Sequence, residues 1–255
     1  MNRRTLVPPT TRSARRGPLH QGRLQLLQAV LFDMDGTLVE TEELWGEAMA
    51  ALALQLGGVL SPAARQRTVG TSMPVAMGIL YADLGVRRTE DEARGDARWV
   101  ENETAALMTS RGMPWRPGAR ELVTAVRDAG LATALVTTTP RRVAAIVLDR
   151  IAAELGASPF DVTVCGDEVP ARKPDPAPYR QAMEELDVDP VACLVIEDSL
   201  VGVAAGLASG AAVLGVPSLQ PLEPQPGLVL RGSLTGLAVA DLADLLAERA
   251  AVTRV

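Results

Sequence analysis

The sequence predicts an α/β fold, a doubly wound parallel sheet with an all-helical subdomain inserted after the first strand. Two observations lead to this prediction. Short apolar segments alternate with segments of helical length, and they lack alternating polarity, as expected for strands covered by helices on both faces. The interval between the first two apolar segments holds about 70 residues of helical pattern, which is too long for an ordinary crossover.

Five segments have the length and apolar character of buried strands, at residues 29–32, 132–137, 161–165, 193–196 and 212–216. Helices are predicted at residues 118–129, 141–155, 176–186 and 199–209. Gly130, Gly156 and Gly210 fall at or just beyond three helix ends, where a left-handed backbone conformation favours glycine. The alternation of strand and helix favours parallel pairing.

Residues 41–112 contain no convincing strand, and helical pattern covers residues 42–56, 62–68, 74–84 and 90–109. We expect these helices to form a cap over the carboxyl ends of the strands, where open α/β sheets bind ligands. The expected organisation is a disordered basic tail at residues 1–25, an α/β core at 26–40 and 113–255, and the helical cap at 41–112.

Composition argues against several classes of protein. The 255 residues carry a net charge of -6, so no broad basic face is expected for nucleic acid or an anionic membrane. Arginine pairs in the tail leave a targeting signal as the alternative to disorder. The one histidine, His20, also lies there, which argues against histidine chemistry in the core. Cys165 and Cys193 are too few for a disulfide framework, so we expect buried thiols. The protein is expected to be cytoplasmic and to be a monomer or a weak homodimer.

The first strand leads directly into two carboxylates, Asp33 and Asp35, followed by Gly36. Side chains two positions apart at a strand end can address one shared site, and glycine lets the backbone turn sharply away. An aspartate-rich turn is the ordinary alternative. A turn alone, however, does not require aspartate at both positions after a buried strand.

Three further strand ends carry polar groups. The second strand ends in Thr137-Thr138-Thr139, Lys173 lies in the loop after the third, and the fourth ends in Glu197-Asp198-Ser199. Each has an ordinary explanation as a helix cap or a solvated loop charge. Together they bring a nucleophile, hydrogen-bond donors, a cation and metal ligands to one edge of a parallel sheet, which favours a catalytic site.

The order of these motifs resembles the haloacid dehalogenase superfamily from about residue 29 onwards. The matching residues are Asp33 to Thr37, Thr137, Lys173, and Glu197 with Asp198. The resemblance implies a Rossmann-like core, and the insertion is similar to the small α-helical cap of the phosphoglucomutase and phosphoglycolate phosphatase branch. Ser199, Gly202, Ala205 and Gly206 are also typical of that branch.

The resemblance also implies roles for these residues. Asp33 would be the nucleophile that forms an aspartyl phosphate, and Asp35 the general acid and base. Mg²⁺ would be bound by the Asp33 carboxylate, the backbone carbonyl of Asp35 and Asp198, with Glu197 bound directly or through water. Lys173 and Thr137 would stabilise the transferring phosphoryl group. The carboxylate at position 35 favours phosphoryl transfer over dehalogenation.

We therefore expect a Mg²⁺-dependent phosphatase acting on a small phosphorylated metabolite: a sugar, polyol or hydroxy-acid phosphate. A sugar phosphomutase is the alternative, although Trp45 and Met73 stand where the mutase branch has a histidine and an arginine. An inactive binding protein on the same scaffold is a further alternative. The candidate substrate-binding residues are Thr138, Trp45, Thr71, Met73 and Arg116.

Overall fold

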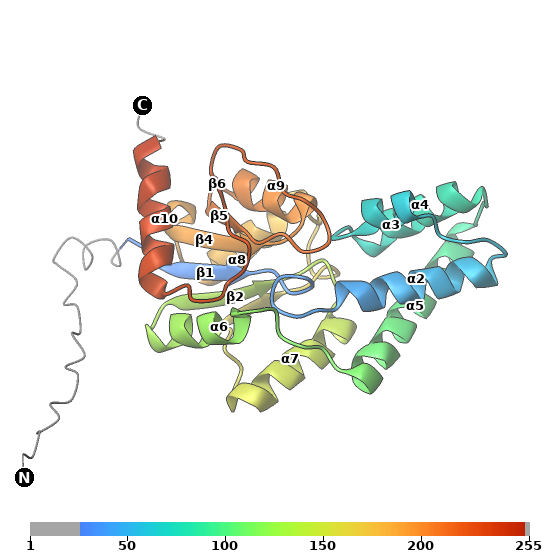
Figure 1. Ribbon diagram of the computed structural model, residues 1–255, viewed down its shortest axis with the longest axis horizontal. Coiled ribbons are helices and arrows are strands. Elements are labelled where there is room, and N and C mark those ends of the chain that lie inside the picture. Colours follow the sequence, from blue (N-terminus) through green and yellow to red (C-terminus); the bar gives the residue numbers. More distant parts are fainter. Residues whose placement is uncertain (1–25, 253–255) are drawn as a thin grey trace, which may run out of the picture.

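The computed structural model describes residues 26–252, which form a parallel sheet with helices on both faces (Figure 1). The strand order is β3-β2-β1-β4-β5-β6, and every neighbouring pair is parallel. The strands are β1 (Ala29–Phe32), β2 (Ala132–Val136), β3 (Val162–Val164), β4 (Cys193–Glu197), β5 (Ala212–Gly215) and β6 (Leu228–Leu230).

Strand β1 is buried on both faces, which explains why its sequence is continuously apolar. Val30 and Phe32 belong to one hydrophobic cluster, together with residues of α6 (Ala119–Asp128), α7 (Arg141–Leu155) and α10 (Val239–Val252). Ala29 and Leu31 belong to a second cluster, with residues of α8 (Ala177–Glu185) and α9 (Leu200–Ser209). A short 3₁₀ helix, η1 (Pro190–Ala192), precedes β4.

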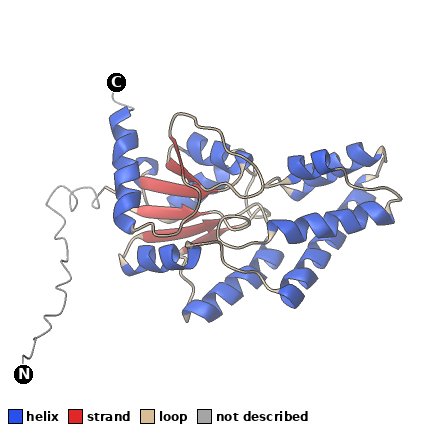
Figure 2. Cartoon of the chain, viewed as in Figure 1, coloured by secondary structure: helices blue, strands red, loops and turns tan. Residues whose placement is uncertain are grey.

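Four helices lie between β1 and α6, at one end of the sheet (Figure 2), and are called the cap below. They are α2 (Glu42–Gln55), α3 (Pro62–Thr68), α4 (Met73–Leu84) and α5 (Glu90–Arg111). Helix α5 begins with a capping box in which the side chains of Thr89 and Glu92 each accept a hydrogen bond from the other's backbone N–H. The cap packs on the core where Arg142 of α7 bonds Asn102 over 2.8 Å and forms an ion pair with Glu101.

The chain enters and leaves the cap at adjacent points. Val39 and Trp115 form an isolated antiparallel β-bridge. The N–H of Glu40 donates to the carbonyl of Pro114 over 2.9 Å, and the N–H of Arg116 donates to the carbonyl of Leu38 over 2.8 Å. The guanidinium of Arg116 adds an ion pair with Glu40, so the two linkers are held together by backbone and side chain alike.

The structure confirms the predicted fold class and the five predicted strands, with ends that differ by at most one residue. Gly130, Gly156 and Gly210 all have positive φ, and both cysteines are buried and free. Strand β6 and helix α10 were not predicted. The tail at residues 1–25 lies outside the described residues. None of the described helices has the length and apolar character needed to cross a membrane.

Candidate active site

The polar groups singled out in the sequence meet at the carboxyl ends of three neighbouring strands. Strand β1 lies between β2 and β4, and the three strands run in the same direction. Asp33 therefore lies next to the end of β2 on one side and next to Glu197 on the other. Its backbone N–H donates to the carbonyl of Ile196 over 3.0 Å, which continues the sheet pairing into the site.

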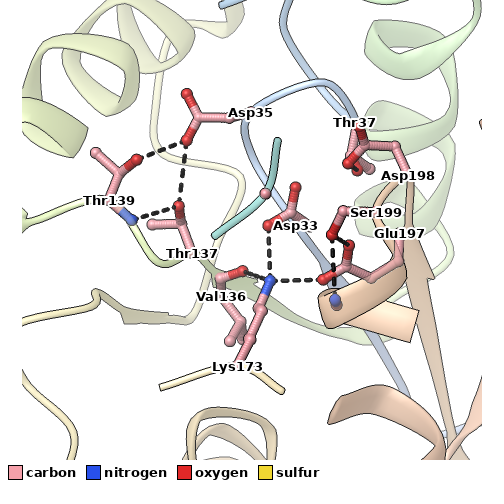
Figure 3. A network of polar contacts seen from close by, with 12 residues as sticks. Asp33, Asp35, Thr37, Val136, Thr137, Thr139, Lys173, Glu197, Asp198 and Ser199 are labelled. Atoms are coloured by element: carbon pink, nitrogen blue, oxygen red, sulfur yellow. Dashed lines mark hydrogen bonds and ion pairs between the residues drawn. The ribbon is translucent and has the colours of Figure 1, made fainter. Parts of the chain in front are cut away.

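Lys173 bridges the two sides of this site (Figure 3). Its Nζ donates to Asp33 Oδ1 over 2.7 Å, to Glu197 Oε1 over 2.6 Å and to the carbonyl of Val136 over 2.8 Å. All three N–H bonds of the ammonium are therefore used. Burial alone would lower the pKa of Lys173, but Asp33 and Glu197 raise it, so the ammonium stays charged.

The carboxylate of Asp35 is held by four donors. Oδ2 accepts hydrogen bonds from Thr139 Oγ1 over 2.7 Å and from Thr137 Oγ1 over 3.3 Å (Figure 3). Oδ1 accepts from Thr41 Oγ1 over 2.5 Å and from Trp45 Nε1 over 3.2 Å. The first two donors follow β2 in the core, whereas Trp45 belongs to cap helix α2, so the orientation of Asp35 depends on both parts of the molecule.

The site carries more negative charge than Lys173 can neutralise. Burial, followed by the charge of Glu197, raises the pKa of Asp33 to about 8 against the lowering effect of Lys173. Burial, with Asp33 and Glu197, also raises the pKa of Asp198 well above its ordinary value. Three buried carboxylates around one ammonium are costly unless a further cation compensates them.

The donor set fits a divalent metal ion. One oxygen from each of Asp33, Glu197 and Asp198 can be chosen so that all three lie within 4.8 Å of one another. Asp198 Oδ1 accepts a hydrogen bond from Thr37 Oγ1 over 3.0 Å, but its buried Oδ2 has no partner among the described residues. A buried carboxylate oxygen without a donor is an expected place for a metal bond, and oxygen ligands suit Mg²⁺.

Gly36 lets the turn after β1 approach the end of β4. Its φ of +79° lies in the left-handed region that favours glycine. A Cβ at this position would lie 2.2 Å from Asp198 Oδ2. Position 36 therefore needs glycine both for its backbone conformation and for the space beside the candidate metal ligand.

A pocket opens over these groups, and most of the predicted site residues line it. Asp33, Asp35, Lys173 and Asp198 form its floor, and the lining also includes Thr138, Trp45, Thr71 and Met73. Glu197 and Thr137 lie behind this surface, in contact with Lys173 and Asp35 respectively. Arg116 is not brought to the pocket, because its guanidinium bonds Glu40 and the carbonyl of Pro217 at the linkers.

Two charged residues of the cap line the pocket but were not assigned to it from the sequence. Arg65 Nη2 donates to Glu42 Oε2 over 3.2 Å, and the N–H of Gly70 donates to Glu42 Oε1 over 3.3 Å. Burial raises the pKa of Glu42 to about 7, although Arg65 opposes this effect. In the sequence Glu42 has the pattern of an ordinary first-turn helix acid, so nothing there signalled its burial.

The cap is closed over the site. A Cβ at Gly70 would lie 2.5 Å from the Cβ of Ser199, which shows how closely the cap loop approaches the first turn of α9. The hollow that remains measures about 40 Å³, which is room for about two or three water molecules.

Comparisons with known proteins agree with this arrangement. Residues 27–210 match the haloacid dehalogenase-like hydrolase family. A phosphorylated carbohydrates phosphatase from Thermotoga maritima is 34% identical over 184 residues, which cover 72% of this chain and 82% of that protein. Hexitol phosphatase B from Escherichia coli K12 is 31% identical over 222 residues, covering 84% of this chain and 96% of that protein.

A similar solved structure is that of CbbY from Rhodobacter sphaeroides in complex with phosphate. It has a TM-score of 0.71 and 28% sequence identity, and the match covers 84% of this chain and 99% of that one. Fold and site together define an α/β protein with a carboxylate-rich centre beneath a helical cap. The chain belongs to the haloacid dehalogenase-like hydrolase family. Its phosphatase relatives support a phosphoric monoester hydrolase.

Proposed function

We propose that the protein is a Mg²⁺-dependent phosphatase that hydrolyses a small phosphate monoester through an aspartyl phosphate on Asp33. The observation that carries the proposal is the position of Lys173 between Asp33 and Glu197, beside the partnerless Oδ2 of Asp198. This arrangement holds one carboxylate next to a fixed positive charge and leaves a second one ready to bind a metal.

Mg²⁺ would be held by the carboxylates of Asp33 and Asp198 and by the backbone carbonyl of Asp35, with Glu197 adjacent. When bound, the ion would offset the repulsion between these carboxylates and the dianionic phosphate ester. Lys173 places a positive charge beside Asp33 and orients its carboxylate, and Thr137 and Thr139 orient the carboxylate of Asp35.

The chemistry proceeds in two displacements. An oxygen of Asp33 attacks phosphorus, the bond from phosphorus to the ester oxygen breaks, and Asp35 gives its proton to the departing alcohol. A water molecule then attacks the aspartyl phosphate, Asp35 takes a proton from that water, and inorganic phosphate leaves. Asp33 is regenerated as a carboxylate and Asp35 as an acid, so protons and charge balance over one cycle.

The proposed substrate is a sugar, polyol or hydroxy-acid phosphate. Relatives named for phosphorylated carbohydrates and for hexitols support the first two classes. The closed hollow of about 40 Å³ is far smaller than the several hundred Å³ of a typical small-molecule site. The cap must therefore open to admit the substrate, and the linkers at Val39 and Trp115 are where it would turn.

The lining of the cap favours hydrolysis over mutase chemistry. A mutase must retain a bisphosphate intermediate, for which a cation in the cap is the natural partner. Trp45 and Met73 both line the pocket, and neither carries charge. Arg65 lines it too, but the guanidinium is already paired with Glu42. A departing alcohol would therefore leave without a strong electrostatic hold on a second phosphate.

A substrate screen tests the proposal. Purified protein is incubated with a panel of phosphate monoesters, with Mg²⁺ and with EDTA, and inorganic phosphate is measured. We expect phosphate release from several small esters only with Mg²⁺, and none from Asp33→Asn. Conversion of β-glucose 1-phosphate to glucose 6-phosphate that outpaces phosphate release, and that needs priming by the 1,6-bisphosphate, would instead show a mutase.

A further inference from the structure

Tyr179 lies directly behind the catalytic lysine. It is the third residue of α8, and it is fully buried. Its hydroxyl donates a hydrogen bond to Glu197 Oε1 over 2.6 Å, and the centroid of its ring lies 4.9 Å from Lys173 Nζ. Tyr179 does not line the pocket, so it acts on the site only through the two charged residues that it touches.

The contacts of Glu197 hold its carboxylate in one orientation. Oε1 accepts from both Lys173 and Tyr179, which uses its two lone pairs, and Oε2 accepts from Ser199 Oγ over 3.2 Å. A Cβ at Gly202 would lie 2.0 Å from the carboxylate atoms of Glu197, so α9 also closes around it. Four residues, Lys173, Tyr179, Ser199 and Gly202, thus determine where this side chain points.

The carboxylate of Asp198, the next residue, is bound by fewer hydrogen-bond donors. Asp198 accepts one hydrogen bond, from Thr37, and its Oδ2 is left without a partner among the described residues. Two consecutive acidic residues at the end of β4 therefore differ in what they can still bind. Both oxygens of Glu197 already accept hydrogen bonds from the chain, whereas Oδ2 of Asp198 can still bind a ligand.

We propose that Tyr179 is a positioning residue that keeps Glu197 as the partner of Lys173 and leaves metal binding to Asp33 and Asp198. The proposal rests on the proposed function and concerns how its site is organised. Lys173 is shared by two carboxylates, Asp33 and Glu197. The hydrogen bond from Tyr179 stabilises the charge of Glu197, so Glu197 attracts Lys173 less strongly. Lys173 therefore remains in contact with Asp33.

Tyr179→Phe removes one oxygen atom and keeps the ring beneath Lys173. We expect kcat to fall about tenfold with KM changed by less than about twofold, as suits the loss of one hydrogen bond to a charged group that never touches substrate. Tyr81→Phe is the matched control, because that hydroxyl also donates to a carboxylate, Asp96 in the cap, over 3.0 Å. Its kcat should equal that of the wild type.

A binding measurement without turnover separates the two carboxylates. Mg²⁺ is titrated calorimetrically into the substrate-free protein. We expect Glu197→Gln and Tyr179→Phe to change the Mg²⁺ dissociation constant by less than about threefold, and Asp198→Asn to raise it at least about thirtyfold. Because Tyr179 is proposed to act through Glu197, adding Tyr179→Phe to Glu197→Gln should lower kcat no further.

Several outcomes would overturn the inference. The first is a Tyr179→Phe enzyme with wild-type kcat. The second is a double variant whose loss of kcat is the product of the losses in Tyr179→Phe and Glu197→Gln. The third is an equal rise of the Mg²⁺ dissociation constant in Glu197→Gln and Asp198→Asn. The last comparison decides the matter even if Tyr179→Phe does not fold. A wild-type protein that releases no phosphate from any ester would instead overturn the proposed function, so the two failures are distinguishable.

Discussion

The indole N–H of Trp45 donates a hydrogen bond to the carboxylate of Asp35 over 3.2 Å, which joins the first cap helix to the floor of the site. Trp45 is 9% exposed, and a buried indole N–H ordinarily finds an acceptor. Here the acceptor is the proposed general acid and base. A residue expected from the sequence to contact substrate therefore also holds the group that would transfer the proton.

Trp45→Phe should slow the hydrolysis of esters with poor leaving groups. The variant keeps an aromatic ring in the cap and loses the donor to Asp35. We expect kcat to fall about three- to tenfold for sugar and polyol phosphates, whose departing alkoxide needs a proton, and less for p-nitrophenyl phosphate, whose leaving group does not. Steady-state kinetics on both kinds of ester measure the difference.

Trp115→Phe is the control for this substitution. The indole of Trp115 also donates to a carboxylate, Glu154, over 2.6 Å, but that pair lies on the surface away from the pocket. The bridge between Trp115 and Val39 is formed by the backbone and does not need the indole, so the activity of Trp115→Phe should match the wild type on every ester. An equal loss for alkyl and nitrophenyl esters in Trp45→Phe would show that the indole does not act through Asp35.

Asp198→Asn should separate metal binding from folding. Asp198→Asn removes a buried carboxylate whose Oδ2 has no donor among the described residues, so it should raise the free energy of unfolding of the metal-free protein by about 1–3 kcal/mol. Mg²⁺ should raise the melting temperature of the wild type, because a ligand that binds only the folded state stabilises it, and should have little effect on the variant. Melting curves with EDTA and with Mg²⁺ measure both effects, and an undiminished Mg²⁺ shift in Asp198→Asn would exclude this residue as a ligand.

Glu42 predicts how stability depends on pH. Burial raises its pKa in the folded protein from 4.5 to about 7, so between these values the unfolded chain releases a proton that the folded chain keeps. The contribution of Glu42 to the free energy of unfolding is therefore greatest below about pH 4.5. It decreases as the pH rises and is lowest above about pH 7. The full difference is on the order of 3 kcal/mol.

Denaturant unfolding in EDTA at several pH values tests this expectation. Glu42→Gln removes the titrating group. The free energy of unfolding of the variant should therefore increase relative to that of the wild type as the pH rises from about 5 to about 8. Glu43→Gln, on the exposed side of the same helix turn, should follow the wild type. Parallel pH curves for Glu42→Gln and the wild type would contradict the prediction.

Gly202→Ala should inactivate the enzyme. The new methyl group would overlap the carboxylate of Glu197, which would have to turn away from Lys173. We expect kcat to fall on the order of a hundredfold, since a displacement of about 1 Å in a catalytic array has effects of this size.

Gly95→Ala is the matched substitution in an open position. Gly95 lies within α5 with no atom within 4 Å of the added carbon, so alanine should stabilise the helix by up to about 1 kcal/mol and leave kcat unchanged. Kinetics and melting temperatures of the two variants are measured together. Full activity in Gly202→Ala would mean that the position of Glu197 is not critical.

The core of the site could be predicted from the sequence because strand direction determines where polar residues meet. Asp33, Thr137 and Glu197 each lie at or just after the carboxyl end of a strand, and parallel pairing brings such ends to one edge. The roles of Thr41 and Tyr179 could not be predicted this way. These roles depend on which face α2 and α8 turn towards the site, and the sequence pattern of a single helix does not determine that.

Two elements near the C-terminal end of the described chain, β6 and α10, were also missed. Strand β6 has only three residues, all half-buried, and it pairs on one side with β5. A short edge strand needs little apolar sequence, so it carries a weak signal. Helix α10 packs on β4, β5 and α6, and its buried Leu242, Leu245 and Leu246 have the spacing of an amphipathic helix, so sequence pattern could have indicated it.

The single β-bridge between Val39 and Trp115 means that some 75 residues leave the sheet and return to it at nearly one point. The strand order and the positions of Asp33 and Lys173 are therefore largely independent of what the intervening helices contain, whereas Asp35 is also held by Trp45 of α2. An insertion anchored in this way can change length or sequence, or be exchanged for a related one, while Asp33 and Lys173 keep their places. The fold thus allows new substrate preferences to arise by replacement of this segment, provided that the new segment again supplies a hydrogen-bond donor to Asp35.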